Sequence, residues 1–155
     1  MKSADIEFRP ALPADVDEVV VRLQEPAERI IGYVFGKRAE RLRTYFAECF
    51  LGNHGFYERE SMHVGLCDNR VVFVITVYEG RKFRRLVWGA IKTTFRVFKL
   101  WDALLILLRT LRVSGLYEPP GKDSWFMANG AVMPECRGKG IFTQFVNDYL
   151  LPQVP

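Results

Sequence analysis

The chain has 155 residues and a formal net charge of +4, a length typical of one domain. Hydrophobic residues make up 49% of it and aromatic residues 14%, which excludes a disordered chain, a collagen and a small disulfide-stapled scaffold. The charge is unevenly distributed, because residues 81–112 carry nine basic side chains and one acidic side chain. The sequence therefore predicts a single domain, residues 1–155, whose basic character belongs to one segment.

Cysteine usage and the N-terminus indicate the compartment. Cys49, Cys67 and Cys136 are widely spaced and form no CxxC pair, which favours free thiols in a reducing environment. Residues 1–7 contain two acids where a signal peptide needs an apolar run. The longest uncharged apolar stretch, residues 103–108, is far shorter than the roughly 20 residues of a membrane span. A cytoplasmic protein is predicted.

The first half of the chain predicts one strand and two helices. Residues 6–8 alternate apolar and polar side chains and form a short strand. A helix follows from Pro13, with apolar residues at helical spacing, and breaks near Pro26. The pattern of residues 37–51 predicts a second helix, which the glycine-rich residues 52–55 end.

The second half opens with a hairpin. Residues 62–67 and 71–78 are rich in strand-forming residues, and Asp68-Asn69-Arg70 between them suits a tight turn. Composition predicts that the basic segment is helical from about residue 83 to 113.

A last strand and a last helix complete the chain. Residues 125–133 read as a strand stopped by Pro134, and residues 140–151 read as a helix. The inner side of that helix is expected to carry Phe142, Phe145, Val146 and Tyr149. The order β-α-α-β-β-α-β-α predicts an α/β (α+β) fold.

The turn between this strand and helix contains the residues that point to a binding site. Gly138 and Gly140 let backbone N–H groups converge on one point, since no Cβ blocks the approach. The following helix N-terminus adds unpaired donors, and Arg137 and Lys139 add positive charge. The turn contains neither GxxxxGK[ST] nor GxGxxG. These residues alone predict an anion-binding strand–loop–helix.

Residues 131–142 resemble the acetyl-CoA signature of the GNAT superfamily of N-acetyltransferases. They fit the pattern (Q/R)-x-x-G-x-(G/A) at Arg137 and Gly140, whereas Phe142 stands where Gly or Ala is usual. Residues 6–15 resemble the opening strand and helix of the same superfamily. The resemblance implies a GNAT-like mixed, mainly antiparallel sheet flanked by helices.

The resemblance also implies an activity: transfer of an acetyl or other acyl group from acetyl-CoA to an amine of a small molecule or protein, by direct attack and without a metal. The cofactor-binding residues that it implies are Gly130, Ala131, Val132, Arg137, Gly138, Lys139, Gly140, Ile141 and Phe142. No catalytic base is assigned, since no spacing distinguishes Glu58, Glu118 or Asn129, and Tyr149 comes too early to match the family's tyrosine. A CoA-binding module without catalysis, serving as sensor or scaffold, is the alternative.

Two departures from the family are notable. Family members continue with further strands after the helix that begins near Gly140, so this chain is expected to be an incomplete domain. We therefore expect an open sheet edge beside residues 125–133. Such an edge would favour formation of a homodimer. Members also pass from the third to the fourth strand by a short turn, whereas here residues 81–120 form a basic helical insertion.

The insertion has two differing faces. Arg81, Arg85, Lys92, Arg96 and Lys99 fall on one helical face, and Trp88, Ile91, Phe95, Phe98, Trp101 and Leu104 cover much of the rest. Three interpretations remain open: a helix packed on the core, a contact with an oligomer or partner protein, and a membrane-surface helix. The last two would make residues 81–112 the centre of an interaction protein. Nucleic acid is disfavoured, because no fold motif accompanies the basic stripe.

Overall fold

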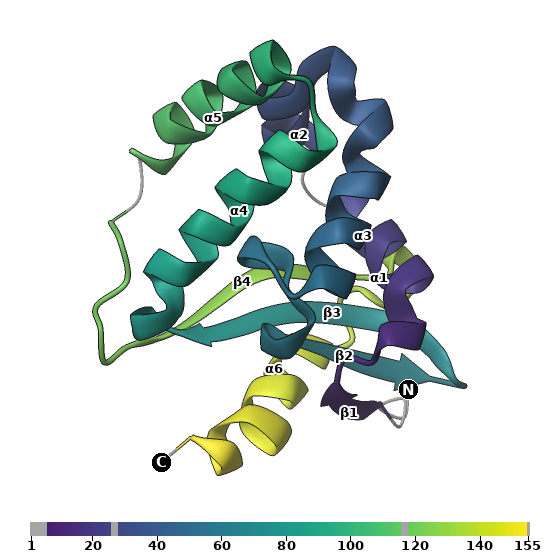
Figure 1. Ribbon diagram of the computed structural model, residues 1–155. Helices are drawn as coiled ribbons and strands as arrows, with labels where there is room; N and C mark the ends of the chain where they lie inside the picture. Colours follow the sequence, from purple (N-terminus) through teal and green to yellow (C-terminus); the bar gives the residue numbers. More distant parts are fainter. Residues whose placement is uncertain (1–5, 26–27, 116–117, 155) are drawn as a thin grey trace.

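The computed structural model describes residues 6–25, 28–115 and 118–154, arranged around one antiparallel sheet (Figure 1). Its strands are β1 (Glu7–Pro10), β2 (Met62–Cys67), β3 (Arg70–Glu79) and β4 (Trp125–Val132), in the spatial order β1-β2-β3-β4. Among the described strands β4 therefore lies at an edge, as the sequence predicts.

The β2–β3 hairpin confirms the predicted turn. Cys67 pairs with Arg70, so the loop has two residues, and Asp68 and Asn69 have φ values of 50° and 60°. Both central residues of such a two-residue turn need a positive φ, which Asp and Asn tolerate. The turn thereby fixes which side chains of β3 face each side of the sheet.

Strand β3 is the centre of the molecule. Its residues 71–78 are each at most 4% exposed, because helices cover both faces of the sheet. Helices α1 (Val16–Gln24) and α3 (Leu42–Gly52) cover one face, and the C-terminal helix covers the other (Figure 1). A strand buried on both faces reads as a continuous apolar run, which explains the composition of this segment.

The N-terminal helical layer differs from the prediction in two places. Helix α2 (Glu28–Phe35) was not predicted, and α3 begins at Leu42, after a 3-10 segment at Gly36–Arg41, rather than at residue 37. Gly36 has a φ of 55°, a left-handed conformation that ends α2 and separates the two helices. One face of α2 enters the core through Ile31, Val34 and Phe35.

The predicted single helix over residues 83–113 is wrong. The segment forms two helices, α4 (Phe83–Val97) and α5 (Leu100–Ser114), because Phe98 and Lys99 adopt extended backbone conformations between them. Phe98 is 4% exposed and packs against two core aromatic rings, those of Phe35 and Tyr45. Burial of the Phe98 ring offsets the free-energy cost of the helical hydrogen bonds that are lost at the break. The sequence has no proline or glycine at this point that would indicate the break.

Most of the apolar residues named for this segment do not pack inward: Trp88, Phe95, Trp101 and Leu104 are exposed, and only Phe98 of that set is fully buried. Helix α4 instead buries Leu86, Thr93, Thr94 and Val97. The two threonine hydroxyls donate to the carbonyls of Gly89 and Ala90, at 3.0 and 2.8 Å. Because these bonds satisfy the hydroxyls, the threonines can occupy the core in place of the larger apolar residues.

The C-terminal helix covers the opposite face of the sheet. It begins as α6 (Ile141–Gln144) and continues as a π-helical turn over Phe145–Leu150. Phe145 is 0% exposed, as expected, but Phe142 is 46% exposed and does not lie on the inner side. The wider π-helical turn changes the residue spacing, so Ile141, Phe145 and Leu150 face the sheet.

Two further features bear on the predicted compartment. No described helix is both long and apolar enough to cross a lipid bilayer. The three cysteines are free, and burial raises the pKa of the Cys49 thiol to about 12. Cys67 and Cys136 are partly exposed.

Candidate functional site

The outer edge of β4 presents backbone polar groups at Val132. The N–H of Met133 donates to the carbonyl of Val72 on β3, at 2.8 Å. The Val132 carbonyl belongs to the same trans peptide and therefore points the opposite way, out of the sheet. In a strand the N–H and C=O of one residue point to the same side, so the Val132 N–H also faces outward. Arg137 folds back to this edge, and its Nε donates to the Val132 carbonyl at 3.0 Å.

A bulge interrupts β4 next to this point. Val74 pairs with Ala131 and Thr76 pairs with Ala128, so Asn129 and Gly130 together lie opposite a single residue of β3. Asn129 has a φ of 55° and its Nδ2 donates to the carbonyl of Phe56 at 3.0 Å. The bulge is thereby tied to the segment that follows α3, and it breaks the regular pairing of β4 at Gly130. An Asn-Gly pair inside a strand was a signal for such a bulge in the sequence.

Replacing Asn129 should separate two contributions to the bulge. We expect Asn129→Ala to lower the free energy of unfolding by about 2 kcal/mol, because it removes the amide hydrogen bond and places alanine in the left-handed region. Asn129→Gly keeps the backbone conformation accessible and should cost about half as much. Urea unfolding measures both values. Equal destabilisation by the two variants would show that the left-handed backbone contributes nothing.

Both glycines of the turn after β4 have left-handed backbone conformations. A 3-10 turn at Pro134–Cys136 reverses the chain, and Gly138 and Gly140 follow with φ values of 72° and 74°. A Cβ at either glycine would meet no neighbouring atom within 4 Å, so the space beside both backbones is open. The helix starts immediately, with the Gln144 N–H donating to the Gly140 carbonyl at 2.9 Å.

Several backbone donors of this turn are unpaired. Among the described backbone hydrogen bonds, none uses the N–H of Gly138, Lys139 or Gly140. The N–H groups of the first helical turn, at residues 141–143, have no partner within the helix either. Arg137 and Lys139 are both exposed beside these donors. Unpaired N–H groups, a helix N-terminus and two cations form an arrangement that can bind an anion.

The three polar residues considered as a catalytic base, Glu58, Glu118 and Asn129, lie in different places. Glu58 is 1% exposed, and its Oε1 accepts hydrogen bonds from the Ser61 hydroxyl at 2.5 Å and from Arg85 at 2.7 Å. It follows Phe56, the residue that holds Asn129, by two positions. Glu118 is exposed and makes no hydrogen bond or ion pair with the described residues. Phe56, Thr76 and Asn129 thus form a polar region beside the bulge, since both side chains donate to the Phe56 carbonyl, whereas neither Glu58 nor Glu118 bonds to it.

Tyr149 belongs to the packing beneath the C-terminal helix. Its hydroxyl lies 3.2 Å from Nδ1 of His63 on β2, and its ring packs against Phe145 and Phe8. Desolvation lowers the pKa of His63. These contacts give Tyr149 a structural position on the inner side of the helix, where the sequence expected it.

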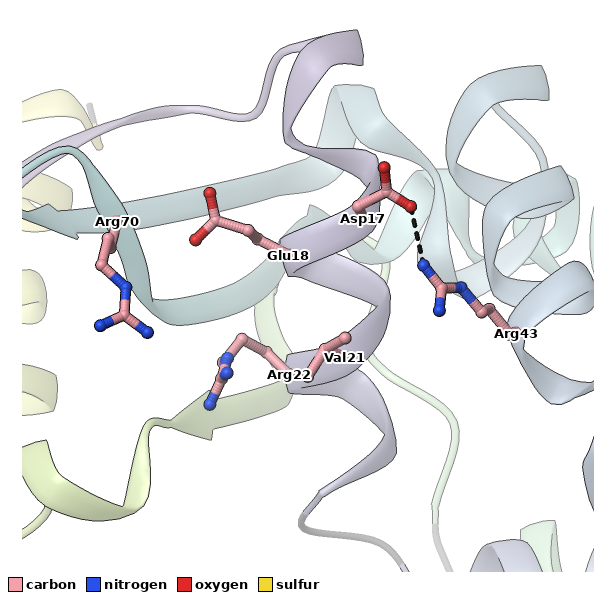
Figure 2. Close-up of a pocket in the computed structure, with 6 residues that line it drawn as sticks. All are labelled: Asp17, Glu18, Val21, Arg22, Arg43 and Arg70. Carbon is pink, nitrogen blue, oxygen red and sulfur yellow. Dashed lines mark hydrogen bonds and ion pairs between the residues drawn. The ribbon is translucent and has the colours of Figure 1, made fainter.

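A separate pocket of about 370 Å³ lies between α1, the start of α3 and the start of β3 (Figure 2). Its charged groups are Asp17, Glu18, Arg22, Arg43 and Arg70. Both carboxylates already have partners, since Asp17 pairs with Arg43 at 2.9 Å and Glu18 accepts the N–H of Val71 at 2.8 Å. None of the residues expected to bind a cofactor lines this pocket.

Metal binding finds no support in the part of the chain that the structure describes. Within residues 6–25, 28–115 and 118–154, no three His, Cys, Asp or Glu side chains lie close enough to hold an ion. The pairs His54 with Glu58 and His63 with Cys67, which have suitable sequence spacing, therefore gain no third ligand from the described residues.

Solved structures share this architecture. An N-acetyltransferase from Staphylococcus aureus Mu50 superimposes with a TM-score of 0.58 over 96% of this chain and 76% of its own, at 15% identity. An agmatine N-acetyltransferase variant in its apo form gives a TM-score of 0.47 over 93% and 68%, at 14% identity. Neither a protein-family model nor a curated protein matches the sequence. The first of these likenesses establishes a GNAT-like fold, which confirms the predicted fold class.

Proposed function

We propose that this chain binds acetyl-CoA and transfers its acetyl group to an amine. Acetyl-CoA supplies an activated thioester. The amine nitrogen attacks the carbonyl carbon, a C–N bond forms, the C–S bond breaks, and the amine proton is lost as the thiolate is released. The proposal rests mainly on one observation: Gly138 and Gly140 are both left-handed, with open space beside them, at the point where an edge strand meets a helix.

Each residue of the turn then has a distinct role. The N–H groups of Gly138, Lys139, Gly140 and Ile141 would bind the pyrophosphate, and the first helical turn ending at Phe142 would add its dipole. The cations of Arg137 and Lys139 would offset the phosphate charge. Phe142 is 46% exposed and lies outside the sheet packing, so it leaves the preceding amides accessible.

The edge of β4 would bind the extended pantetheine arm. The outward N–H of Val132 and the bulge at Gly130 offer polar groups to its amides, while Ala131 pairs with Val74 and holds the strand in the sheet. This arrangement would position the thioester near the bulge, where backbone N–H groups could stabilise negative charge on its oxygen.

One observation favours a second candidate, a CoA-binding module without catalysis. The buried carboxylate nearest in sequence to the polar region beside the bulge is Glu58, and its Oε1 already accepts bonds from Arg85 and Ser61. A carboxylate engaged in this way is a poor acceptor for an amine proton. Binding and catalysis therefore need separate measurements.

Substitution of Gly140 tests the binding part. We expect Gly140→Asp to weaken acetyl-CoA binding at least tenfold in calorimetry, because a carboxylate would occupy the space proposed for phosphate. Asp is among the residues that tolerate a positive φ best, which limits the backbone strain.

Gly36→Asp is the matched control. Gly36 is also left-handed, and an added Cβ there would meet only the mobile end of the Arg109 side chain, so the variant has comparable backbone strain away from the turn. Equal affinity of the two variants, or no binding by the unmodified chain, would contradict the proposal. Thioester cleavage in the presence of a panel of amines then separates an enzyme from a binding module.

A further inference from the structure

The outward face of α5 is apolar. Four large side chains recur on it at three- and four-residue spacing: Trp101, Leu104, Leu108 and Leu111. They are between 43% and 81% exposed, whereas Ala103 and Ile106 on the inward face are at most 2% exposed. A helix packed on a core normally turns its polar face to solvent. An exposed stripe of this size indicates a binding surface.

The outward face of α4 combines aromatic and basic residues. Trp88 is 60% exposed and Phe95 is 41% exposed. Arg84 lies four residues before Trp88 and Lys92 four residues after it, so the cations and rings share one face. Helices α4 and α5 meet at residues 98–99 and form the arms of a V on the side of the sheet away from the C-terminal helix (Figure 1).

The cations of this surface are not neutralised by the protein. No carboxylate of the described residues lies within ion-pair distance of Arg84, Lys92, Lys99 or Arg112. Three other basic residues of the segment do pair with carboxylates, namely Arg81 with Asp123, Arg85 with Glu58 and Arg96 with Glu48. The four unpaired cations make the apolar surface positive as well.

These two properties select among possible partners. A second copy of the chain would bring the same positive charge against itself, which costs free energy. Nucleic acid would pair with the cations and leave the leucine stripe of α5 in water. An anionic bilayer accepts both kinds of group, because rings and leucines enter the headgroup boundary while Lys and Arg remain with the phosphates.

We propose that the outward faces of α4 and α5 bind the surface of an anionic lipid bilayer, with both helices lying in the plane of the interface. This role goes beyond acetyl transfer and requires neither acetyl-CoA nor an amine. The apolar stripe of α5 supplies the buried area, and the unpaired cations supply the selectivity for anionic lipid.

Co-sedimentation with vesicles tests the proposal. We expect the protein to bind vesicles of phosphatidylcholine with phosphatidylglycerol, and to bind pure phosphatidylcholine far more weakly. The protein has three tryptophans, Trp88, Trp101 and Trp125, which are 60%, 81% and 44% exposed. Entry of Trp88 and Trp101 into the interface should shift the emission to shorter wavelength.

Matched variants locate the surface. Leu108→Glu should lower the partition coefficient by more than about tenfold, because Leu108 is part of the inserted stripe. Leu151→Glu, a similarly exposed leucine at the C-terminal end, should leave binding unchanged. Lys92→Gln should lower the partition coefficient about fivefold, and Lys122→Gln should have little effect.

Four results would overturn the proposal. The first is no vesicle binding even at low salt, and the second is equal binding to both kinds of vesicle. The third is an equal effect of Leu108→Glu and Leu151→Glu on vesicle binding. The fourth is a protein that does not bind lipid but self-associates, with self-association abolished by Leu108→Glu. The last result would assign the surface to a second copy of the chain. None of these measurements depends on acetyl-CoA, so the proposed function can fail or succeed independently.

Discussion

Phe145→Ala is expected to lower the free energy of unfolding by about 3–5 kcal/mol, the usual cost of removing a fully buried phenylalanine ring. Phe145 is 0% exposed, and its ring lies 5.2 Å from that of Phe73 and 5.5 Å from that of Phe8, measured between centroids. A domain of this size is stable by only about 5–15 kcal/mol, so the variant would lose a large part of its stability. Urea unfolding monitored by circular dichroism measures the change.

The effect should extend to ligand binding. The same side chain fastens the C-terminal helix to the sheet, and that helix begins directly after Gly140. We therefore expect Phe145→Ala to weaken acetyl-CoA binding as well. Phe142→Ala is the matched control in the same helix, since Phe142 is 46% exposed, and its cost should stay within about 0.5 kcal/mol. Similar losses in the two variants would contradict the observed orientation of the helix.

Arg85→Ala is expected to cost about 2–3 kcal/mol, because it leaves the buried Glu58 carboxylate without its cation. Glu58 is 1% exposed and lies 2.7 Å from Arg85, and the Ser61 hydroxyl is the second donor to the same oxygen. The Arg85 side chain is 51% exposed, so water can replace part of the lost interaction, which places the cost below that of a fully buried pair. Thermal and urea unfolding both report the difference.

A neighbouring arginine and a double-mutant cycle complete this experiment. Arg84→Ala removes an exposed cation that has no carboxylate of the described residues in ion-pair range, and should cost no more than about 0.5 kcal/mol. In a Glu58→Gln background the effect of Arg85→Ala should become small, since no buried charge remains. An unchanged cost in that background would mean that Arg85 acts through packing of its aliphatic stem.

The parts of the fold that the sequence predicts well are those governed by local rules. The Asp68-Asn69 turn, the strands on either side of it and the left-handed glycines after Pro134 all depend on backbone conformations that few residue types adopt. The same rule is the basis of the predicted anion-binding turn, whose ligand stays a prediction.

The errors arose where tertiary packing decided the outcome. Nothing local at Phe98 indicates that its ring enters the core and divides one basic helix into two. Thr93 and Thr94 occupy the core because their hydroxyls bond to the preceding turn, while Trp88 and Trp101 face solvent. Hydrophobic periodicity counts side chains by type, and therefore could not decide which face of the segment packs on the core.

The polar region beside the bulge was beyond prediction for a different reason. The Phe56 carbonyl accepts hydrogen bonds from the side chains of Thr76 and Asn129, which come from distant segments and meet only when β3 pairs with β4. Their spacing in the sequence carries no trace of this contact.

The acceptor amine and the expected homodimer stay predictions.

The bulge also has a consequence for solubility. An edge strand of eight residues is a template on which other chains can polymerise, and β4 has that length. The left-handed Asn129 interrupts the regular row of donors and acceptors, and the Arg137 side chain occupies the Val132 carbonyl beyond it. Neither half of the strand offers an uninterrupted template to an incoming strand. The irregularity that would serve a ligand thus also protects the chain from aggregation.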